Sequence, residues 1–599
     1  MLSSFRCISL LLLGSLVAQA TLADEPSPAA PLMKLLQSGR LPKERVGTVV
    51  EMVCQKGNAQ DLAFVFEQVQ KPDAFPPKVR LKVLELLTDA ALVRKVRPAG
   101  DLAPLQTLLE AKADPQLKLA AVKLASIWNV KELAPQLQAL ASSDKTDSLL
   151  RAAAIDGLAN LNDDDSRQTL TRLAKAPFPI GSRIRATAAL ARVNLDEAVQ
   201  LAGDVLTAAS PQDDLPHLVD AILGRQGGAE KLAAALAGVK LPKEVAKVTL
   251  RYMYSVGRSD QELSNLLSLA AEISLDAPPP TQEEVLKIAA EVAAKGDAAR
   301  GEKVFRRADV NCQKCHALAR AGGQVGPELT ALGSISPPEY IVNSILNPSL
   351  NIKEQYVTKV FLTTDGEVVT GILVDRNDER VRLKDASGKL ITLASDDIEG
   401  EKEGPSLMPQ GLTKFLTHQE FLDLAQFVSQ LGRPGPYAIR TLPTMQRWRV
   451  LQTPSPALAG EIPSVDVVRD ELLGIPAERW LPAYGKIGGT LPLGDVRELI
   501  KLEGAGIVWL QGEIDVSQGG EIQLDIHFPA KGHLWVDAEP FELAAKSDGA
   551  HQITLPLTAG RHKLTFRLPL AAEEDASLLR VEVQKPAGSG VQFDVVGGQ

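Results

Sequence analysis

The sequence predicts a multidomain α + β protein with a helical-repeat region, a helical domain that carries a β-insert, and an antiparallel β-sandwich. Three observations predict this order. Helical hydrophobic periodicity with almost no strand signal dominates residues 30–275. Two amphipathic helical patterns enclose a group of strand-like runs in residues 296–433, and Gly-bounded strand-like runs fill residues 440–599. A chain of 599 residues is long enough for three or four domains.

The composition is that of an ordinary globular protein. Hydrophobic residues make up 45% of the chain and charged residues 23%, close to the usual balance. The formal net charge of -9 is modest for this length and gives no reason to expect a nucleic-acid partner.

Residues 1–23 have the pattern of a secretory signal peptide. Arg6 precedes an apolar run over residues 8–18, and small residues follow around Ala20 and Ala23, where cleavage is expected. The alternative, a membrane anchor, is disfavoured because the run is too short to span a bilayer. We therefore expect an exported protein, periplasmic or associated with the cell surface, without a transmembrane anchor after cleavage.

Related segments recur within the helical region. They lie at residues 118–125, 151–158 and 185–191, at spacings of 33 and 34 residues, which predicts one pair of helices per repeat. The segments resemble HEAT-type repeats, in which a basic residue and small residues open the second helix of each pair. This resemblance implies a HEAT-like α-solenoid over residues 30–275 with a protein-docking surface. A helical domain without a partner is the alternative.

Residues 276–295 are expected to connect the repeats to the next domain. Asp276–Pro280 contains three consecutive prolines, which predicts a stiff, extended linker. Thr281 and Glu284 have the spacing of a capping box, so a helix is expected to begin there and run to about Ala294.

The segment Cys312-Gln-Lys-Cys315-His316 is the strongest chemical motif in the chain. Two thiols three residues apart, followed at once by an imidazole, form the attachment pattern of c-type haem. On a helical turn these positions share one face, so both sulfurs could form thioethers while His316 ligates the iron. A zinc site is the alternative, but it would need a second Cys/His pair. We expect one covalent haem c.

Cys54 would be the one cysteine left in the mature chain after haem attachment. No intramolecular disulfide is therefore expected. Cys54 follows the apolar pattern of residues 49–53, which predicts a buried, unreactive thiol.

The motif is enclosed by two amphipathic helical patterns. They span residues 296–305 and 416–428, and Thr417 with Glu420 forms a second capping box. The pair resembles the N- and C-terminal helices of cytochrome c, which cross through a small residue and an aromatic side chain. The resemblance implies that Gly301, Phe305 and Phe427 make this contact.

The segment Gly322–Leu329 also resembles cytochrome c, where a Gly-Pro segment passes the proximal histidine. The resemblance implies that the carbonyl of Pro327 accepts the Nδ1 proton of His316, which would fix its tautomer.

Met408 is the candidate for the second axial ligand of the iron. Pro409 favours an extended backbone at Met408, and Gly411 permits a tight turn, so the loop could hold a thioether against the iron. Methionine ligation would raise the reduction potential. The alternatives are that Met408 is a core residue, that His418 is the ligand, although it is expected to face solvent, or that the sixth position is open.

A long stretch separates His316 from Met408 and is largely strand-like. Runs of β-branched residues at 356–362, 367–374, 380–383 and 389–393, with turn residues between them, predict a small antiparallel β-insert over about residues 355–400. The order of motifs resembles the haem-binding domain of exported planctomycete-type proteins, in which this domain often follows HEAT-like repeats. A propeller dehydrogenase domain, which sometimes precedes it there, has no counterpart in this sequence.

The C-terminal region is expected to be all β. Strand-like runs lie at residues 506–510, 521–526, 533–537, 552–555, 563–568 and 578–583. Their spacing predicts an antiparallel β-sandwich. Leu534–Asp537 and Leu557–His562 resemble parts of jelly-roll accessory modules of the carbohydrate-binding or PA14-like kind.

Four of the five tryptophans fall in this region: Trp448, Trp480, Trp509 and Trp535. We expect them to pack in the core, and stacking on a carbohydrate is the alternative.

Three functional hypotheses follow. The first is an exported monohaem c-type cytochrome that transfers single electrons, is not an enzyme, and docks unidentified redox proteins through its accessory domains. The second is a haem enzyme or enzyme subunit, peroxidatic or dehydrogenase-linked, with an open or labile sixth ligand. No nucleotide loop, nucleophile motif or acid–base pair supports another active site. The third is a haem-containing interaction scaffold.

Overall fold

The chain combines many helices with several antiparallel sheets, so the α + β class is confirmed at that level. It forms two compact units, residues 1–193 and 194–599, which are described separately. The predicted signal peptide lies outside the described residues. The computed structural model describes residues 27–38, 40–110, 114–275, 278–307, 309–310, 312–459, 462–528, 530–543, 549–571 and 578–598.

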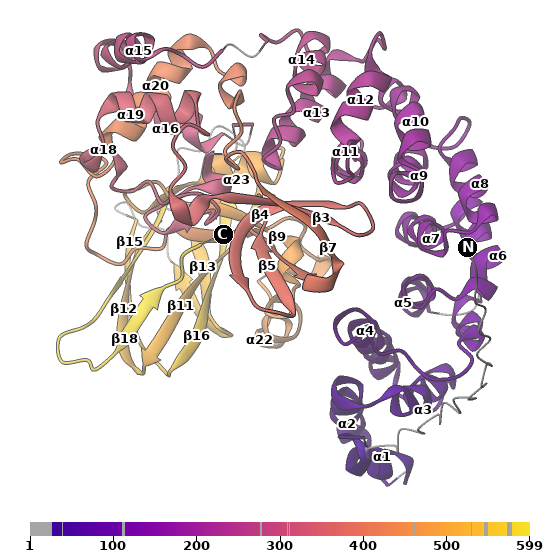
Figure 1. Cartoon of the computed structure of the whole chain (residues 1–599). Coiled ribbons are helices and arrows are strands. Elements are labelled where there is room, and N and C mark those ends of the chain that lie inside the picture. Colours follow the sequence, from indigo (N-terminus) through magenta and orange to yellow (C-terminus); the bar gives the residue numbers. More distant parts are fainter. Residues whose placement is uncertain are drawn as a thin grey trace, which may run out of the picture. The chain divides into compact units, whose positions relative to one another are not determined.

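The first unit is built from helices that follow one another in pairs (Figure 1). The three recurring segments of the sequence fall in α5, α7 and α9, with α6 and α8 between them, so one pair of helices per repeat is confirmed. The helices are α1 (Ala30–Gln37), α2 (Lys43–Lys56), α3 (Ala59–Gln70), α4 (Pro77–Val93), α5 (Pro115–Ile127), α6 (Ala134–Ser142), α7 (Ser148–Leu161), α8 (Asp164–Leu173) and α9 (Ile180–Val193).

Aspartates and small side chains explain how these helices begin and pack. The side chains of Asp114, Asp147 and Asp163 accept hydrogen bonds from the first free N–H groups of α5, α7 and α8, which satisfies donors that have no helical partner. Small residues such as Ala121 and Ala154 are fully buried and allow α5 and α7 to approach closely.

Cys54 lies in α2 and is 2% exposed. Burial raises the pKa of its thiol to about 12, because the thiolate would lose its hydration. The expected buried thiol is confirmed.

The second unit begins with further helices and contains the Cys312–His316 segment. Both predicted capping boxes are present, at Thr281–Glu284 and Thr417–Glu420. The helices are α10 (Leu195–Ala208), α11 (Leu215–Leu223), α12 (Gly228–Leu236), α13 (Lys243–Ser255), α14 (Gln261–Ala270), α15 (Gln282–Lys295), α16 (Ala298–Arg306), α17 (Cys312–Cys315), α18 (Leu332–Ile335), α19 (Pro338–Leu346) and α20 (His418–Gln430).

Helices α16 and α20 cross at Gly301. A Cβ atom at this position would lie 1.9 Å from the carbonyl oxygen of Asp423 and 2.8 Å from Cβ of Phe427, so only glycine permits the approach. The rings of Phe305 and Phe427 then meet with centroids 5.5 Å apart. The predicted contact of Gly301, Phe305 and Phe427 is therefore present.

The predicted β-insert is a five-stranded antiparallel sheet in the order β6-β5-β4-β3-β7. Its strands are β3 (Thr358–Thr363), β4 (Val368–Arg376), β5 (Arg380–Lys384), β6 (Leu390–Ala394) and β7 (Ile398–Glu403). Phe361, Val369, Val381 and Leu383 form its buried core. The turns contain Gly366 and Gly388, which both have positive φ.

Strand β7 was not predicted from the sequence. Its residues, Ile-Glu-Gly-Glu-Lys-Glu, have low β propensity. The strand lies at the edge of the sheet, where charged residues discourage further pairing, and Lys359 and Arg376 of neighbouring strands form ion pairs with Glu401. The fold therefore supplies ion-pair partners for β7 that the local sequence does not reveal.

The C-terminal region forms two antiparallel sheets, in the orders β10-β17-β12-β15 and β14-β13-β16-β11-β8-β9, with β18 pairing β11. Side chains of both sheets form one hydrophobic core that includes Trp448, Leu524 and Phe566. The strands are β8 (Arg447–Leu451), β9 (Trp480–Tyr484), β10 (Thr490–Pro492), β11 (Gly506–Gln518), β12 (Gly520–His527), β13 (Gly532–Val536), β14 (Glu539–Leu543), β15 (Ala550–Leu557), β16 (Gly560–Leu570), β17 (Leu578–Gln584) and β18 (Gln592–Val595).

The four tryptophans of this region are core residues. Trp448, Trp509 and Trp535 are at most 1% exposed and Trp480 is 7% exposed. The expectation of core packing is confirmed, and these indoles offer no face for stacking on a sugar.

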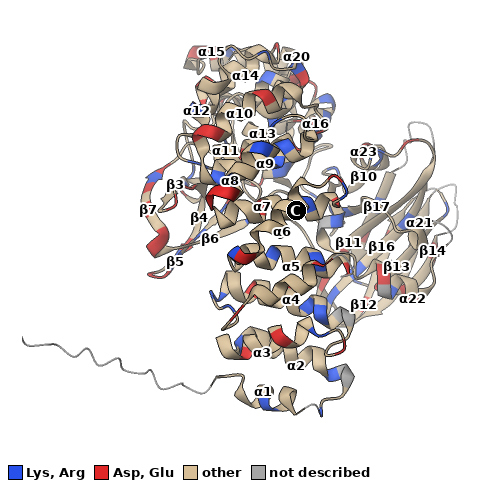
Figure 2. Ribbon diagram, turned by 90° about the vertical axis from the view of Figure 1, so that its right-hand side faces the viewer, with Lys and Arg blue, Asp and Glu red and all other residues tan. Residues whose placement is uncertain are grey.

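The distribution of charged residues and the hydropathy of the helices bear on the expected partners. Figure 2 shows Lys and Arg interspersed with Asp and Glu along the helices α1 to α14. No helix among the described residues is both long enough and apolar enough to cross a membrane.

Candidate functional site

The segment from Cys312 to His316 forms one helical turn, as its spacing predicts. Helix α17 spans both cysteines, and the backbone N–H of His316 donates to the carbonyl of Cys312 across 2.9 Å. The glycine-rich segment that follows folds back over this turn. Gly323 N–H donates to Gln313 O at 2.9 Å and Gly326 N–H donates to Cys315 O at 2.8 Å. These bonds hold the motif in one conformation.

The imidazole of His316 is oriented by Pro327. Its Nδ1 lies 2.8 Å from the carbonyl oxygen of Pro327, which is the contact that the resemblance to cytochrome c implies. Because a carbonyl can only accept, Nδ1 carries the proton and the lone pair of Nε2 is left for a ligand. Burial lowers the pKa of His316, and the hydrogen bond to Pro327 acts in the opposite direction, so the ring is neutral at physiological pH.

Gly326 leaves room for this ring. A Cβ atom at Gly326 would lie 2.6 Å from Cε1 and 2.8 Å from Nδ1 of His316. Any larger residue would have to displace the imidazole or the loop. The glycine therefore forms part of the site although it carries no functional group.

We expect Gly326→Ala to disturb the orientation of His316. The added methyl group would push the ring away from Pro327, since real Cβ atoms essentially never lie this close to a non-bonded heavy atom. The change is measured by the ¹⁵N chemical shifts of the His316 ring, which report its tautomer and hydrogen bond in the protein without haem.

Gly400→Ala is the matched control, because a Cβ atom there has no neighbour within 4 Å. Unchanged His316 shifts in Gly326→Ala would show that the loop moves instead of the ring.

All five site residues that the sequence singled out line one cavity. Cys312, Cys315, His316, Pro327 and Met408 contribute to its wall, and its empty volume is about 1500 Å³ including the part open to solvent. The remaining wall is mostly apolar. It includes side chains of α16, α19 and α20, such as Phe305, Ile341, Leu424 and Val428, and others from the loops between these helices. The fold thus brings segments that are more than ninety positions apart in the chain to one cavity.

Met408 reaches the cavity from a loop with defined hydrogen bonds. Its N–H donates to Ser406 Oγ at 3.2 Å, and Ser406 N–H donates to Ser349 Oγ at 3.1 Å. Gly411 takes up φ +96° and turns the chain into the short 3-10 helix Leu412–Phe415, which precedes α20. The loop therefore presents a thioether, a soft ligand, to the space that His316 also faces.

His418, the rival axial ligand, lies elsewhere. It opens α20, its side chain is 65% exposed, and its Nε2 lies 3.1 Å from Glu291 Oε2 on α15. It does not line the cavity, so the expectation that it faces solvent is confirmed.

The chemistry of the cavity wall fits the haem that the sequence predicts. Within the described ranges, no group of three or more His, Cys, Asp and Glu side chains is arranged to bind a metal ion. Burial raises the pKa of Cys312 to about 12 and also raises that of Cys315, because the thiolates would lose their hydration. An apolar cavity with one imidazole, one thioether and two thiols in its wall suits a flat, largely apolar cofactor that brings its own equatorial ligands.

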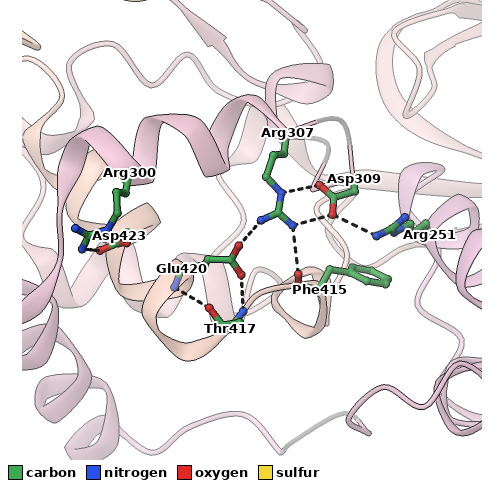
Figure 3. A network of polar contacts seen from close by, with 8 residues as sticks. All are labelled: Arg251, Arg300, Arg307, Asp309, Phe415, Thr417, Glu420 and Asp423. Atoms are coloured by element: carbon green, nitrogen blue, oxygen red, sulfur yellow. Dashed lines mark hydrogen bonds and ion pairs between the residues drawn. The ribbon is translucent and has the colours of Figure 1, made fainter. Parts of the chain in front are cut away.

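A network of ion pairs holds the segment that precedes the Cys312–His316 motif. Figure 3 shows Arg307 between Asp309 and Glu420, with Arg251 of α13 reaching Asp309 from the other side. The Asp309 pKa is lowered chiefly by its hydrogen bond from Arg307. The network ties the segment before Cys312 to the first turn of α20 and to α13.

Several cavity residues were not identified from the sequence as site residues. Ser344, Asn351, Lys353, Tyr356 and Ile372 line the cavity. They come from α19, from the segment before β3 and from β4, and no local motif marks them. Their only sequence signal was their position between the attachment motif and Met408.

The comparisons with known proteins leave the family open. No family model matches the chain. No curated protein matches it. Among solved structures, a Bacillus thuringiensis Cry1Da tryptic core variant is 9% identical over 95% of this chain and 98% of that chain, with a TM-score of 0.12; a likeness at this level carries no argument.

Proposed function

We propose that this chain is an exported monohaem c-type cytochrome that transfers single electrons. The observation that carries the proposal is the shared cavity: Cys312, Cys315, His316 and Met408 line the same apolar space, although only the first three are neighbours in sequence. When bound, haem c would supply one-electron Fe(III)/Fe(II) chemistry at this site.

Each residue of the site has a role in the proposal. Cys312 and Cys315 would attach the cofactor by adding their S–H groups across its vinyl double bonds, which forms two C–S bonds without an oxidant or a leaving group. His316 would hold the iron through Nε2, with Pro327 holding its Nδ1 proton. Met408 would hold the iron through its thioether. The ammonium group of Lys353, at the cavity wall, would attract the carboxylates of the haem.

The other parts of the chain complete the proposal as docking modules. The paired helices of residues 30–275 would form a HEAT-like α-solenoid, residues 296–433 a cytochrome c-like domain with its β-insert, and residues 440–599 a jelly-roll-like β-sandwich. The partners would be redox proteins in the periplasm or at the cell surface. An enzymatic role is not part of the proposal.

The substitution Met408→Ala tests the axial ligand. We expect the oxidised wild-type protein to show the weak long-wavelength absorption band of a methionine–iron bond and the variant to lose it, with the haem still attached. The reduction potential should fall, because the thioether favours ferrous iron. Visible spectra of both oxidation states and a redox titration measure these changes.

Met52→Ala is the matched control, because Met52 is 42% exposed in the first unit and should leave the spectrum unchanged. A high-spin ferric spectrum in the wild type would overturn Met408 as a ligand and favour a ligand-binding or peroxidatic haem. Absence of covalent haem in protein matured with it would overturn the proposal as a whole.

A further inference from the structure

The corner between helices α13 and α14 touches the loop that carries Met408. Gly257, in this corner, has φ +75°, and a Cβ atom there would lie 3.0 Å from Cδ2 and 3.2 Å from the carbonyl oxygen of Leu407. Leu407 is 7% exposed and packs with Val325 and the partly buried Cys315. The residue next to Met408 is thus confined between the helical corner and the attachment motif.

The segment that follows Met408 is held by the same two helices. The ammonium group of Lys414 lies 3.2 Å from Ser264 Oγ and 3.1 Å from Ser268 Oγ of α14. It also lies over the ring of Tyr254, 5.8 Å from its centroid. The next residue, Phe415, meets the Tyr254 ring edge-on with centroids 6.1 Å apart. The loop is therefore fixed to α13 and α14 on both sides of its Gly411 turn.

The attachment motif itself contacts the same helix. Lys314, between the two cysteines, donates from Nζ to the carbonyl of Ser255 at the end of α13 across 3.0 Å. Arg251, one turn earlier, lies 3.2 Å from Asp309 and its guanidinium lies 5.2 Å from the centre of the Phe415 ring. Helix α13 thus lies outside residues 296–433 and contacts both segments.

We propose that the α13–α14 corner positions the sixth ligand, with Gly257, Tyr254 and Lys414 as positioning residues. The inference rests on the proposed function, because it assumes that Met408 is the ligand. The corner sets the distance between the Met408 loop and the His316 turn, since it contacts both and belongs to neither. By linkage, haem binding and the order of this corner stabilise one another, so anything that moves α13 shifts the equilibrium between a bound and an unbound methionine.

Gly257→Ala tests the proposal, and Gly238→Ala is its matched control. Both glycines have positive φ, +75° and +80°, but a Cβ atom at Gly238 has no neighbour within 4 Å. Both variants therefore carry the same backbone strain, and only Gly257→Ala pushes Leu407. We expect Gly257→Ala to lose the methionine–iron band while it keeps covalent haem, and Gly238→Ala to keep both.

A second readout does not depend on the iron. In the full chain without haem, Gly257→Ala should exchange the Leu407 and Met408 amide protons about tenfold faster than Gly238→Ala does. Lys414→Met, which keeps the apolar stem and removes the ammonium group, should speed the same amides without altering a glycine. The Lys414→Met variant therefore tests the proposal even if the Gly257→Ala protein does not fold.

The outcomes separate the two proposals. A wild-type protein with covalent haem but without a methionine band would overturn the ligand assignment of Met408, and with it this inference. A wild-type band that survives in both Gly257→Ala and Lys414→Met, with unchanged amide exchange, would overturn the role of the corner alone.

Discussion

Replacing both Cys312 and Cys315 with alanine is expected to abolish covalent haem attachment. Each thioether needs a thiol in the cavity wall, and the described part of the chain contains one further thiol, that of Cys54, which is buried in α2 of the other compact unit. Mass spectrometry of the denatured protein measures the result: the wild type should carry the added mass of one haem and the double variant none. Single variants should retain one bond, because the two sulfurs attach independently.

Cys54→Ala is the matched control for this experiment. It removes a cysteine that lies outside the cavity, so its haem content should equal that of the wild type. Retention of covalent haem by the double variant would contradict the assignment of the attachment motif. Loss of haem in Cys54→Ala would show that the assay reports misfolding.

The second large effect is expected at the crossing of α16 and α20. Gly301→Ala should lower the free energy of opening these helices by about 2 kcal/mol or more, the upper part of the range for overpacked cores. The reason is the 1.9 Å separation between the new Cβ atom and the Asp423 carbonyl oxygen. Separation of the helices would also disturb the Asp423 carboxylate, which is 3% exposed and accepts from Arg300 Nε at 2.7 Å.

Native-state hydrogen exchange of the α16 and α20 amides measures this loss, because it reports local opening free energies. Gly181→Ala in α9 is the control: a Cβ atom there has no neighbour within 4 Å. Alanine is the better helix former, so the α9 amides should be unchanged or protected by up to about 1 kcal/mol more. Equal protection of α16 and α20 in wild type and Gly301→Ala would show that the helices do not cross through this residue.

Local patterns in the sequence predicted most of the secondary structure. The two capping boxes at Thr281 and Thr417 placed the first turns of α15 and α20, because a side chain that bonds the N3 amide acts within four residues. The alternation of β-branched residues predicted β3 to β6, because this pattern also depends on neighbouring residues of one strand. Strand β7 escaped prediction, since its glutamates are stabilised by Lys359 and Arg376 from other strands.

Some residues of the candidate site were also predicted from the sequence, and others were not. The motif at Cys312–His316 was visible because its chemistry needs three residues on one helical turn. Pro327 was placed by resemblance, Met408 was placed from its loop residues Pro409 and Gly411 and partly by resemblance, and both line the cavity. Ser344, Lys353 and Tyr356 had no local signal, because their position depends on how α19 and the β-insert are folded around the cavity.

Contacts across the longest separations had no signal at all. Near the C-terminus, Asp594 pairs with Arg320 through two bonds of 2.6 and 2.7 Å, and Gly322 N–H donates to Gly598 O at 3.0 Å. These contacts hold the two short antiparallel strands that follow His316, β1 (Ala317–Leu318) and β2 (Ala321–Gly322). A charged residue at the end of a chain has many candidate partners, and only the folded arrangement selects one.

The sequence by itself determined the helix pairs, the strands with alternating patterns and the one-turn spacing of Cys312–His316, because each depends on residues that are close in the chain. The glycine at the crossing of α16 and α20 was placed by resemblance, since its contacts with Asp423 and Phe427 join distant segments. The tertiary structure decided which residues share the cavity, that His418 lies away from it, and that α13 holds both the motif and the Met408 loop. These features depend on burial and on contacts between distant segments. Neither is encoded in any single stretch of the chain.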